Sequence, residues 1–353
     1  TDTFNTAVGF NAGLAVTTGV QNTLIGGLAG DAITTGQLNT ALGYGALSAN
    51  TTGGVNVALG YNALLSNTTA NNNVAIGNAS MGANTTGTFN VGVGQGSLAA
   101  NTTASNNTAV GKSALAANTT GAALTAVGTN AGKAVTTSAG STCIGVDSAT
   151  GLTTGNNNVF VGHNAGTHVV PTTTGAQNCI VGAYSYCTTA GGDYANILGY
   201  AIGGAAGYTT VGQAGSDIRA AHGNITWATV SDERYKKEIV DSEAGLSFIN
   251  ALQPRTFKYK TLGELPETFS AYEADSTEVF KNSETNHGFI AQEVKAAIDA
   301  DASIKDGFRL WDDREDGSQE VAEAALIPVL VKAIQEQSAL ITSLTARVAE
   351  LEG

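Results

Sequence analysis

The first 212 residues repeat one short pattern of apolar and polar positions. A glycine recurs every 17 residues from Gly9 to Gly162, with an aliphatic residue before it and, in most units, an asparagine four positions before it. Each unit has a short alternating stretch, the glycine bend, a second short stretch and a Thr/Asn/Gly turn. Alternation with period two, β-branched residues and regularly placed turn residues indicate strands. Seventeen residues are too few for a strand and a helix, so the sequence predicts a β-solenoid of about twelve coils.

Such a solenoid would be a rod of roughly 60 Å, because stacked coils rise by the strand spacing of ~4.8 Å. The recurring asparagine, as in Asn22, Asn39 and Asn56, is expected to form a hydrogen-bonded ladder along it. Few large apolar side chains are present in each unit, which predicts a thin core and favours three identical chains around one axis. The repeat resembles the head repeats of trimeric autotransporter adhesins and the collar-like repeats of phage tail fibres, a resemblance of architecture rather than of ligand.

The period breaks after Gly162. The next equivalent glycine is Gly182, three residues late, and the insertion lies around residues 168–171. Several tyrosines follow: Tyr184, Tyr186, Tyr194, Tyr200 and Tyr208. Tyrosines on a scaffold of small residues are typical of a surface that binds sugar or protein, and we take them as a candidate receptor surface. The alternative is a wider, aromatic-packed end cap of the solenoid.

A different pattern follows residue 212. Residues 213–230, with a short strand at 224–227, are expected to connect the solenoid to a mixed α/β domain over 231–353. In that domain the pattern predicts elements at these positions: a helix over 244–252, a strand over 255–260, a strand or turn at 287 that enters a helix, and a strand at 309–311.

A heptad repeat closes the chain and predicts a coiled coil over about 326–352. One seam position holds Ile327, Ile334, Ile341 and Val348, and the other holds Leu330, Gln337, Leu344 and Leu351. Ile and Leu at these two positions permit a dimer. A trimer is favoured here because the seam has to match the rod. The predicted fold class is therefore mainly β: a trimeric solenoid, then a mixed α/β domain that ends in a trimeric coiled coil.

Charge divides the chain at the same place. The net charge is −13, and nearly all charged residues follow Trp227, which is typical of a domain boundary. A nucleic-acid partner is not expected, because no basic surface is available to replace phosphate counterions. No apolar run approaches the roughly 20 residues that cross a bilayer, so membrane insertion is not expected. The three cysteines lack metal-ligand spacing and the acidic residues of the repeat are scattered, so we expect neither metal nor cofactor, nor a glycan-degrading site.

Four motifs after residue 230 occur in a characteristic order. They are Ser231-Asp232-Glu233-Arg234-Tyr235-Lys236, then Leu252-Gln253-Pro254 with Phe257-Lys258-Tyr259, then Gly288-Phe289-Ile290-Ala291-Gln292-Glu293-Val294, and finally the heptad helix. In this order they resemble the intramolecular chaperone domain of phage endosialidases and tail fibres. The resemblance implies a trimeric domain that directs assembly of the preceding fibre and then cuts itself off. Tyr235 stands where that family more often has Leu.

The resemblance also implies which residues act. Ser231 would be the nucleophile, Lys236 its base, and Val230–Ser231 the bond that is cut. A serine hydroxyl needs a base to take its proton, and Ser-Lys pairs are a known solution. Taken without the resemblance, Ser231 is better explained as a helix N-cap with acidic residues in the first turn. His287, Gln292 and Glu293 are candidate supporting residues, and a packed turn is the alternative explanation for them.

The sequence therefore predicts a homotrimeric virion protein, a tail fibre made in the host cytoplasm. Its C-terminal domain would act as chaperone and as a single-turnover serine peptidase, without cofactor or metal. Its partners would be other tail proteins and a host cell-surface receptor, either glycan or protein. The alternative is a trimeric cell-surface adhesin with a coiled-coil assembly domain and no proteolysis.

Overall fold

The chain divides into two compact units, Thr1–Asp232 and Glu233–Gly353. The computed structural model describes residues 4–214, 216–224, 227–229, 231–302, 304, 310–313 and 317–352. Each unit is described by itself. The first is the repeat, and the second carries the charged C-terminal segment.

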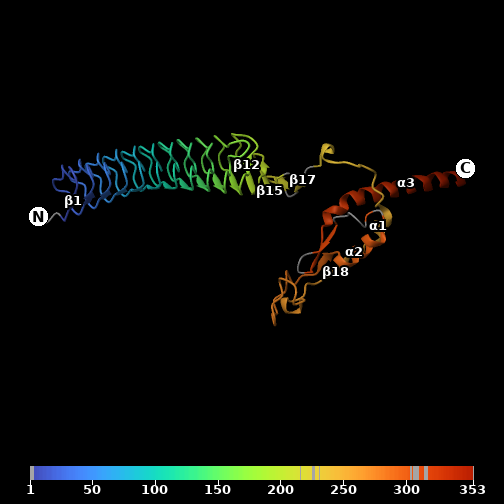
Figure 1. The fold of residues 1–353 in the computed structure, drawn as a ribbon. Helices are drawn as coiled ribbons and strands as arrows, with labels where there is room; N and C mark the ends of the chain where they lie inside the picture. The colour runs from blue at the N-terminus through green and yellow to red at the C-terminus, as the bar shows by residue number, and fades with distance from the viewer. Residues whose placement is uncertain are drawn as a thin grey trace. The chain divides into compact units, whose positions relative to one another are not determined.

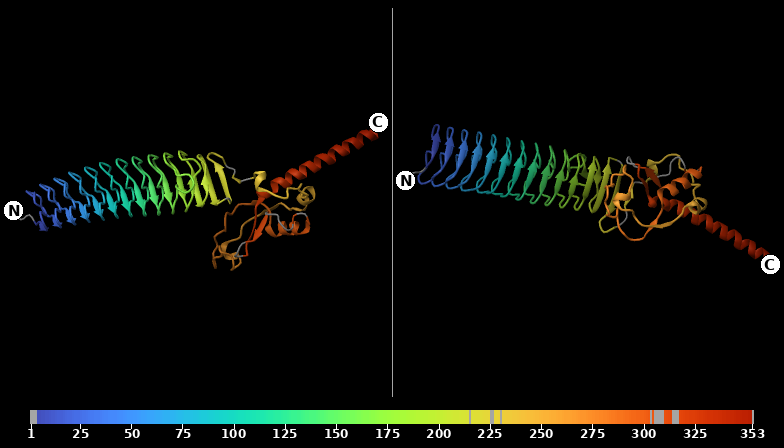
Figure 2. Two further views of the ribbon diagram at one scale, coloured as in Figure 1. Left: turned by 45° about the horizontal axis from the view of Figure 1, so that its top comes forward. Right: turned by 90° about the horizontal axis from the view of Figure 1, so that it is seen from below.

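The first unit is a β-solenoid, and the fold is mainly β as predicted (Figure 1). Each coil contributes one short strand that pairs in parallel with its equivalent one coil on, so that Thr40 lies beside Val57 and Leu42 beside Leu59. Arrows of successive coils therefore lie side by side along one face, and turns form the rest of each coil (Figure 2). The parallel strands are β1 (Thr6–Val8), β2 (Thr23–Ile25), β3 (Thr40–Leu42), β4 (Val57–Leu59), β5 (Val74–Ile76), β6 (Val91–Val93), β7 (Thr108–Val110), β8 (Thr125–Val127), β9 (Thr142–Ile144), β10 (Val159–Val161), β11 (Cys179–Val181), β13 (Asn196–Tyr200) and β15 (Tyr208–Gln213).

The solenoid core is made of small residues at the centres of the strands and larger ones in the second stretch. Ala41 and Ala58 are fully buried, and so is Leu64. The aliphatic residue before each bend glycine instead faces outward, as Leu42 does with 46% of its surface exposed. The core is thus complete within one chain although it is thin, and a stripe of aliphatic side chains is left on the strand face.

The second stretch of each unit is not a strand, contrary to the sequence-based expectation. It is a run of turns in which alternate residues have positive φ, such as Leu47 at 57° and Leu64 at 51°. Its amides still pair between coils, because Leu47 donates to the carbonyl of Ala63 at 3.0 Å. This zigzag turns the leucines inward while it keeps the backbone satisfied.

Glycine at the bend is required for two separate reasons. Gly26 has a φ of 131°, which side-chain-bearing residues rarely adopt. A Cβ atom there would also lie 2.5 Å from the carbonyl oxygen of Gly43 in the next coil. Both conditions recur along the stack, and this explains why the bend residue is glycine in one coil after another.

The predicted asparagine ladder is present and buried. Asn39 accepts the amide N–H of Asn56 at 3.0 Å, and its own Nδ2 donates to the carbonyl of Gly53 at 2.9 Å. A second ladder, at the Asn-Thr-Thr turn, joins side chain to side chain, as in Asn84 Nδ2 to Asn67 Oδ1 at 3.0 Å. Each buried amide is thereby satisfied by its copy in a neighbouring coil.

The solenoid changes form near its C-terminal end. Strands β12 (Tyr186–Cys187) and β14 (Gly203–Gly204) add a second short parallel pair. Beyond β15 the sheet continues with antiparallel strands β16 (Ser216–Ala221) and β17 (Ala228–Thr229). Part of the predicted strand at 224–227 lies outside the described residues. The antiparallel pairing ends the regular stack of parallel coils.

The second unit contains short elements around a small core. They are the 3-10 turn η1 (Glu233–Tyr235), α1 (Leu246–Ala251), β18 (Arg255–Phe257), η2 (Leu262–Glu264), β19 (Asn286–Gly288), α2 (Ala291–Ala300), β20 (Trp311–Asp313), β21 (Gln319–Val321), η3 (Glu323–Ala325) and α3 (Leu326–Glu352). β18 pairs with β19 and β20 with β21, both antiparallel. Phe248, Val294 and Leu310 meet the first turns of α3 in the core. The elements match the predicted positions, although Arg309 lies outside the described residues.

Helix α3 leaves its apolar seam uncovered within this chain. Beyond its first turns it extends past the rest of its unit (Figure 1). Ile341 is 65% exposed and Leu344 61% exposed. By length and composition alone this segment also passes as a membrane-spanning helix, with a mean hydropathy of 1.3, which qualifies the expectation drawn from apolar runs. Its apolar residues nevertheless recur with heptad spacing, which favours a partner helix.

Candidate functional site

Ser231 and Lys236 lie on the short connection between the solenoid and the core of the second unit. Both side chains are exposed, and they stand on either side of η1, whose turn is closed by the amide of Lys236 donating to the carbonyl of Glu233 at 2.9 Å. The unit boundary falls between Asp232 and Glu233. Val230, the other residue of the predicted scissile bond, lies outside the described residues.

His287 and Gln292, two of the candidate supporting residues, line one cleft of the second unit. The cleft has a volume of about 640 Å³ and is also lined by Tyr259, Lys281 and Glu320. The ammonium of Lys281 lies 5.3 Å from the centre of the Tyr259 ring, a cation–π distance. The structure thus places His287 and Gln292 together, at the end of β19 and the start of α2.

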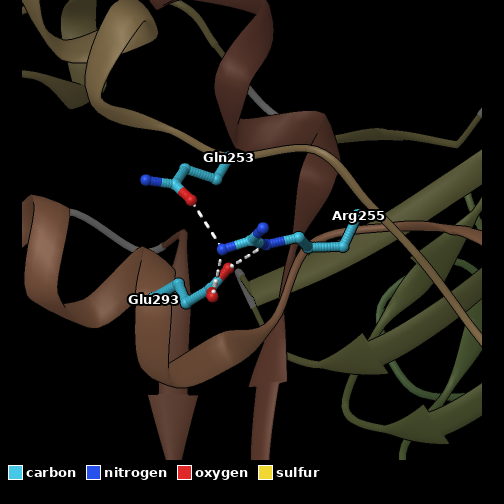
Figure 3. A network of polar contacts seen from close by, with 3 residues as sticks. All are labelled: Gln253, Arg255 and Glu293. Carbon is cyan, nitrogen blue, oxygen red and sulfur yellow. Dashed lines mark hydrogen bonds and ion pairs between the residues drawn. The ribbon is translucent and has the colours of Figure 1, made fainter.

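Glu293 has a different environment, although it is adjacent to Gln292 in sequence. Its carboxylate accepts two hydrogen bonds from the Arg255 guanidinium, at 3.0 Å from Nε and 2.8 Å from a terminal nitrogen (Figure 3). The same nitrogen donates to Gln253 Oε1 at 2.6 Å. Hydrogen bonding to Arg255, with its positive charge, lowers the pKa of Glu293, and the pKa of Arg255 is raised in turn. The pair ties β18 to α2, which is a structural role.

Three of the five candidate tyrosines gather at one place on the solenoid. Tyr184 lies 5.9 Å from Tyr200 between ring centroids, and His168 contacts both Tyr184 and Tyr186. His163, from the preceding coil, completes the group at 5.0 Å from Tyr184. We call these five residues the aromatic cluster.

The other two tyrosines do not join these ring contacts within the described residues. The guanidinium carbon of Arg219 lies 5.3 Å from the centre of the Tyr208 ring. Tyr194 is exposed. Sequence reasoning missed both histidines of the cluster. His168 lies in the insertion, and that departure from the period was the available signal.

Two of the three cysteines, Cys143 and Cys187, are buried free thiols. Burial raises the pKa of the Cys143 thiol to about 12 and also raises that of Cys187. A thiol that stays protonated is a poor nucleophile. Across the described part of the chain, no group of three His, Cys, Asp or Glu residues is placed to hold a metal ion.

The fold and these sites define a class: a β-solenoid fibre followed by a small α/β unit with an unpaired heptad helix. Residues 231–302 match a peptidase family whose description is chaperone of endosialidase. The match begins at Ser231 and runs through the helix α2. No curated protein and no solved structure shows significant similarity to the chain.

Proposed function

We propose that residues 231–353 form an intramolecular chaperone that brings three chains together and then cuts the Val230–Ser231 bond. The observation that carries this proposal is the family match that begins at Ser231, the residue directly after the proposed scissile bond. A family match that starts at the proposed cut site is what a domain released at that site would give. The exposed seam of α3 supports the assembly role.

The chemistry needs only groups of this chain. The amine of Lys236 acts as the base that takes the proton of the Ser231 hydroxyl, and Oγ attacks the carbonyl carbon of Val230. The Val230–Ser231 C–N bond breaks, its nitrogen is protonated as the new amino terminus of Ser231, and an ester joins Val230 to Oγ. Water then hydrolyses this ester to a carboxylate at Val230 and restores the hydroxyl. Each chain reacts once, because the residue that attacks is part of its own substrate.

Assembly of the rod explains the need for a chaperone. Identical coils leave few signals against a slip by one repeat, both within one chain and between the chains of a trimer. The outward aliphatic stripe, from Ile25 through Leu42 to Ile144, is a surface that two further copies would cover. A coiled coil of α3 would align three chains before the stripes pack together. Removal of the clamp would leave a fibre held by a high unfolding barrier.

The mature fibre would serve in attachment. We place it in a virion tail, made in the host cytoplasm, with other tail proteins at one end and a host cell-surface receptor as ligand. The candidate receptor surface is the tyrosine-rich end of the solenoid, which cleavage at Val230 would leave near the new terminus.

Denaturing gel electrophoresis tests the proteolysis. The wild type should yield two fragments, whereas Ser231→Ala and Lys236→Ala should each yield one intact chain. Lys237→Ala, at the adjacent lysine, is the control and should cleave. Mass spectrometry of the smaller fragment should find Ser231 as its first residue.

Three outcomes would count against the proteolysis assignment. They are intact wild-type chain, cleavage in Ser231→Ala, or a fragment that begins elsewhere. Intact wild type that still forms trimers would favour the adhesin alternative.

A further inference from the structure

We propose that the aromatic cluster of His163, His168, Tyr184, Tyr186 and Tyr200 is a binding subsite for a neutral pyranose of a cell-surface glycan. The inference rests on the proposed attachment role and narrows it to one ligand class and one place on the rod. It also leaves out Tyr194 and Tyr208, which the sequence alone had grouped with the others.

The cluster is an array of rings at right angles around Tyr184. His163 and Tyr184 meet at an interplanar angle of 86°, and Tyr184 and Tyr200 at 83°. The ring centroid of His168 lies 5.0 Å from that of Tyr184 and 6.1 Å from that of Tyr186. Such edge-to-face contacts hold the rings in fixed orientations. Both histidines are exposed, and Tyr200 is 51% exposed, so the array faces solvent.

The coils beneath the cluster keep it rigid. Phe160 fills the position that alanine occupies in most coils and is fully buried. Gly166 passes directly over it, since a Cβ there would lie 2.4 Å from the Phe160 ring. Tyr186 lies against Gly203 in the same way, with its ring 3.0 Å from where a Cβ would be. A ligand would therefore meet a surface that is already ordered, which reduces the entropy lost on binding.

The cluster occurs where the repeat departs from its own rule. Asn158 and Asn178, equivalent ladder residues, are separated by 20 positions instead of the 17 that separate Asn39 and Asn56. The three extra residues, 20 minus 17, belong to the loop that carries His168. Insertions on one face of a repeat protein are frequently its binding surface. The residue after the bend glycine is polar in several middle coils, as at Gln95 and Thr129, and is His163 and Tyr200 here. Aromatic residues also occupy this position near the N-terminus, at Phe10, Tyr44 and Tyr61.

The chemistry of the cluster matches a sugar better than a protein. A pyranose presents an apolar face of C–H groups and a rim of hydroxyls, and rigid aromatic rings with polar tips complement both. Within the described part of the chain, the phenol groups of Tyr184 and Tyr200 make no hydrogen bond to the protein and can pair with ligand hydroxyls. The only polar contact at the rings is between His163 Nε2 and the Asn164 amide, at 3.3 Å, among those described residues.

A neutral sugar fits better than an acidic one. Among the described residues no lysine or arginine lies over a ring of the cluster, and Arg219 lies over Tyr208 instead. A carboxylate would therefore find no ammonium or guanidinium group among the five residues. A protein partner of standard size would need roughly 800 Å² on this side, which is more than five partly exposed side chains supply.

The test uses the full-length chain on immobilised oligosaccharides that end in glucose, galactose, mannose, N-acetylglucosamine or rhamnose. A sialic-acid-terminated oligosaccharide is included as the acidic comparison. The wild type should bind at least one neutral sugar, and Tyr200→Ala and His168→Ala should each weaken that binding by about tenfold. Both side chains are exposed, so neither change should shift the thermal unfolding midpoint. Tyr61→Ala is the matched control, since Tyr61 is 53% exposed and stacks on Tyr44 at the other end of the rod.

The outcomes separate this inference from the function on which it rests. Glycan binding that persists in both cluster variants, or that falls equally in Tyr61→Ala, would leave the attachment role standing. It would show that the aromatic cluster is not the binding site. A wild type that binds none of the neutral sugars, or only the sialylated one, overturns the inference. Cleavage is read from the same samples on a gel, so a failure of the peptidase assignment is visible independently of binding.

Discussion

The solenoid and the C-terminal unit bury their apolar residues in opposite ways. In the solenoid every coil completes its core with the next coil, and residues such as Ala58, Leu64 and Phe160 are fully buried. In the second unit the core is small, gathered around Phe248 and Leu310, while most of α3 is exposed. The solenoid is therefore self-sufficient in its interior, whereas the second unit carries much of its apolar surface on the outside.

The comparison indicates where a partner chain matters most. The stripe on the solenoid is half exposed, and its residues have neighbours on both sides in the sheet. The seam of α3 is more exposed, and beyond the first turns the helix has few contacts with its own chain. An isolated helix in water is only marginally stable, so α3 gains most from association. The proposed assembly of chains is therefore expected to start at α3 and not in the rod.

The largest effect is expected from a charge in that seam. Ile341→Glu, made in a Ser231→Ala background so that the clamp stays attached, would place three carboxylates in one layer of the coiled coil. Burial of unpaired charges costs several kcal/mol, about enough to abolish the trimer at micromolar concentration. Sedimentation velocity should show monomers. Ala346 lies off the seam, so Ala346→Glu should leave trimers intact. If both variants sediment alike, α3 is not the segment that holds the chains together.

The next effect concerns the bend of the solenoid. Gly77 has a φ of 126°, and a Cβ there would lie 2.7 Å from the carbonyl carbon of Gly94. Gly77→Ala should lower the free energy of unfolding by about 3–5 kcal/mol, from backbone strain and steric overlap together. Gly207 has a φ of 73° with nothing within 4 Å, so Gly207→Ala should cost only about 1 kcal/mol. Chemical denaturation of the solenoid would compare them, and equal costs would contradict the coil-to-coil argument.

The ladder of buried asparagines should give a smaller loss. Asn73 accepts the amide of Asn90 at 2.9 Å and donates to the carbonyl of Gly87 at 2.9 Å. Asn73→Ala leaves the Asn90 amide buried without a partner, at a cost of about 1–3 kcal/mol. The Gly87 carbonyl keeps its second donor, Asn84 Nδ2, at 3.0 Å. Asn73→Ser should recover about 1 kcal/mol, because Ser141 occupies the equivalent position and accepts the amide of Asn158 at 3.1 Å. If Asn73→Ser is no more stable than Asn73→Ala, the asparagine ladder stabilises the solenoid by packing and not by hydrogen bonding.

Much of the solenoid was predictable because its period repeats. The step of the glycines located the strands and bends, and the recurring asparagine predicted the first ladder. The orientation of the strands was not predictable in the same way. Alternation with period two leaves two possible faces, and only the coordinates show Ala41 inside and Leu42 outside. The prediction of a strand for the second stretch was wrong for a related reason. Leucine ordinarily avoids positive φ, so its positive φ in these turns could not be inferred from the sequence.

Candidate site residues could be nominated from the sequence only where they are close neighbours in it. Ser231 and Lys236 are five residues apart, so a motif was sufficient to nominate them. The aromatic cluster joins His163 to Tyr184 across a coil, and the separation is set by an insertion rather than by the repeat. Arg255 and Glu293 are distant in sequence, and nothing in either segment indicated that Glu293 would pair and leave Gln292 in the cleft.

The smallest effect is expected from that pair. Its two partners are solvent-exposed, so screening limits its contribution. Arg255 lowers the pKa of Glu293 below the ordinary value of 4.5, so the contribution is present above about pH 4.5 and disappears as the pH falls through the folded-state pKa. Glu293→Gln should therefore lower the unfolding midpoint slightly near neutral pH and not at all in strong acid, and added salt should narrow the difference. Gln253→Ala keeps the ion pair and should preserve the pH dependence. A Glu293→Gln variant that loses cleavage while it unfolds like the wild type would instead place this carboxylate in the peptidase site.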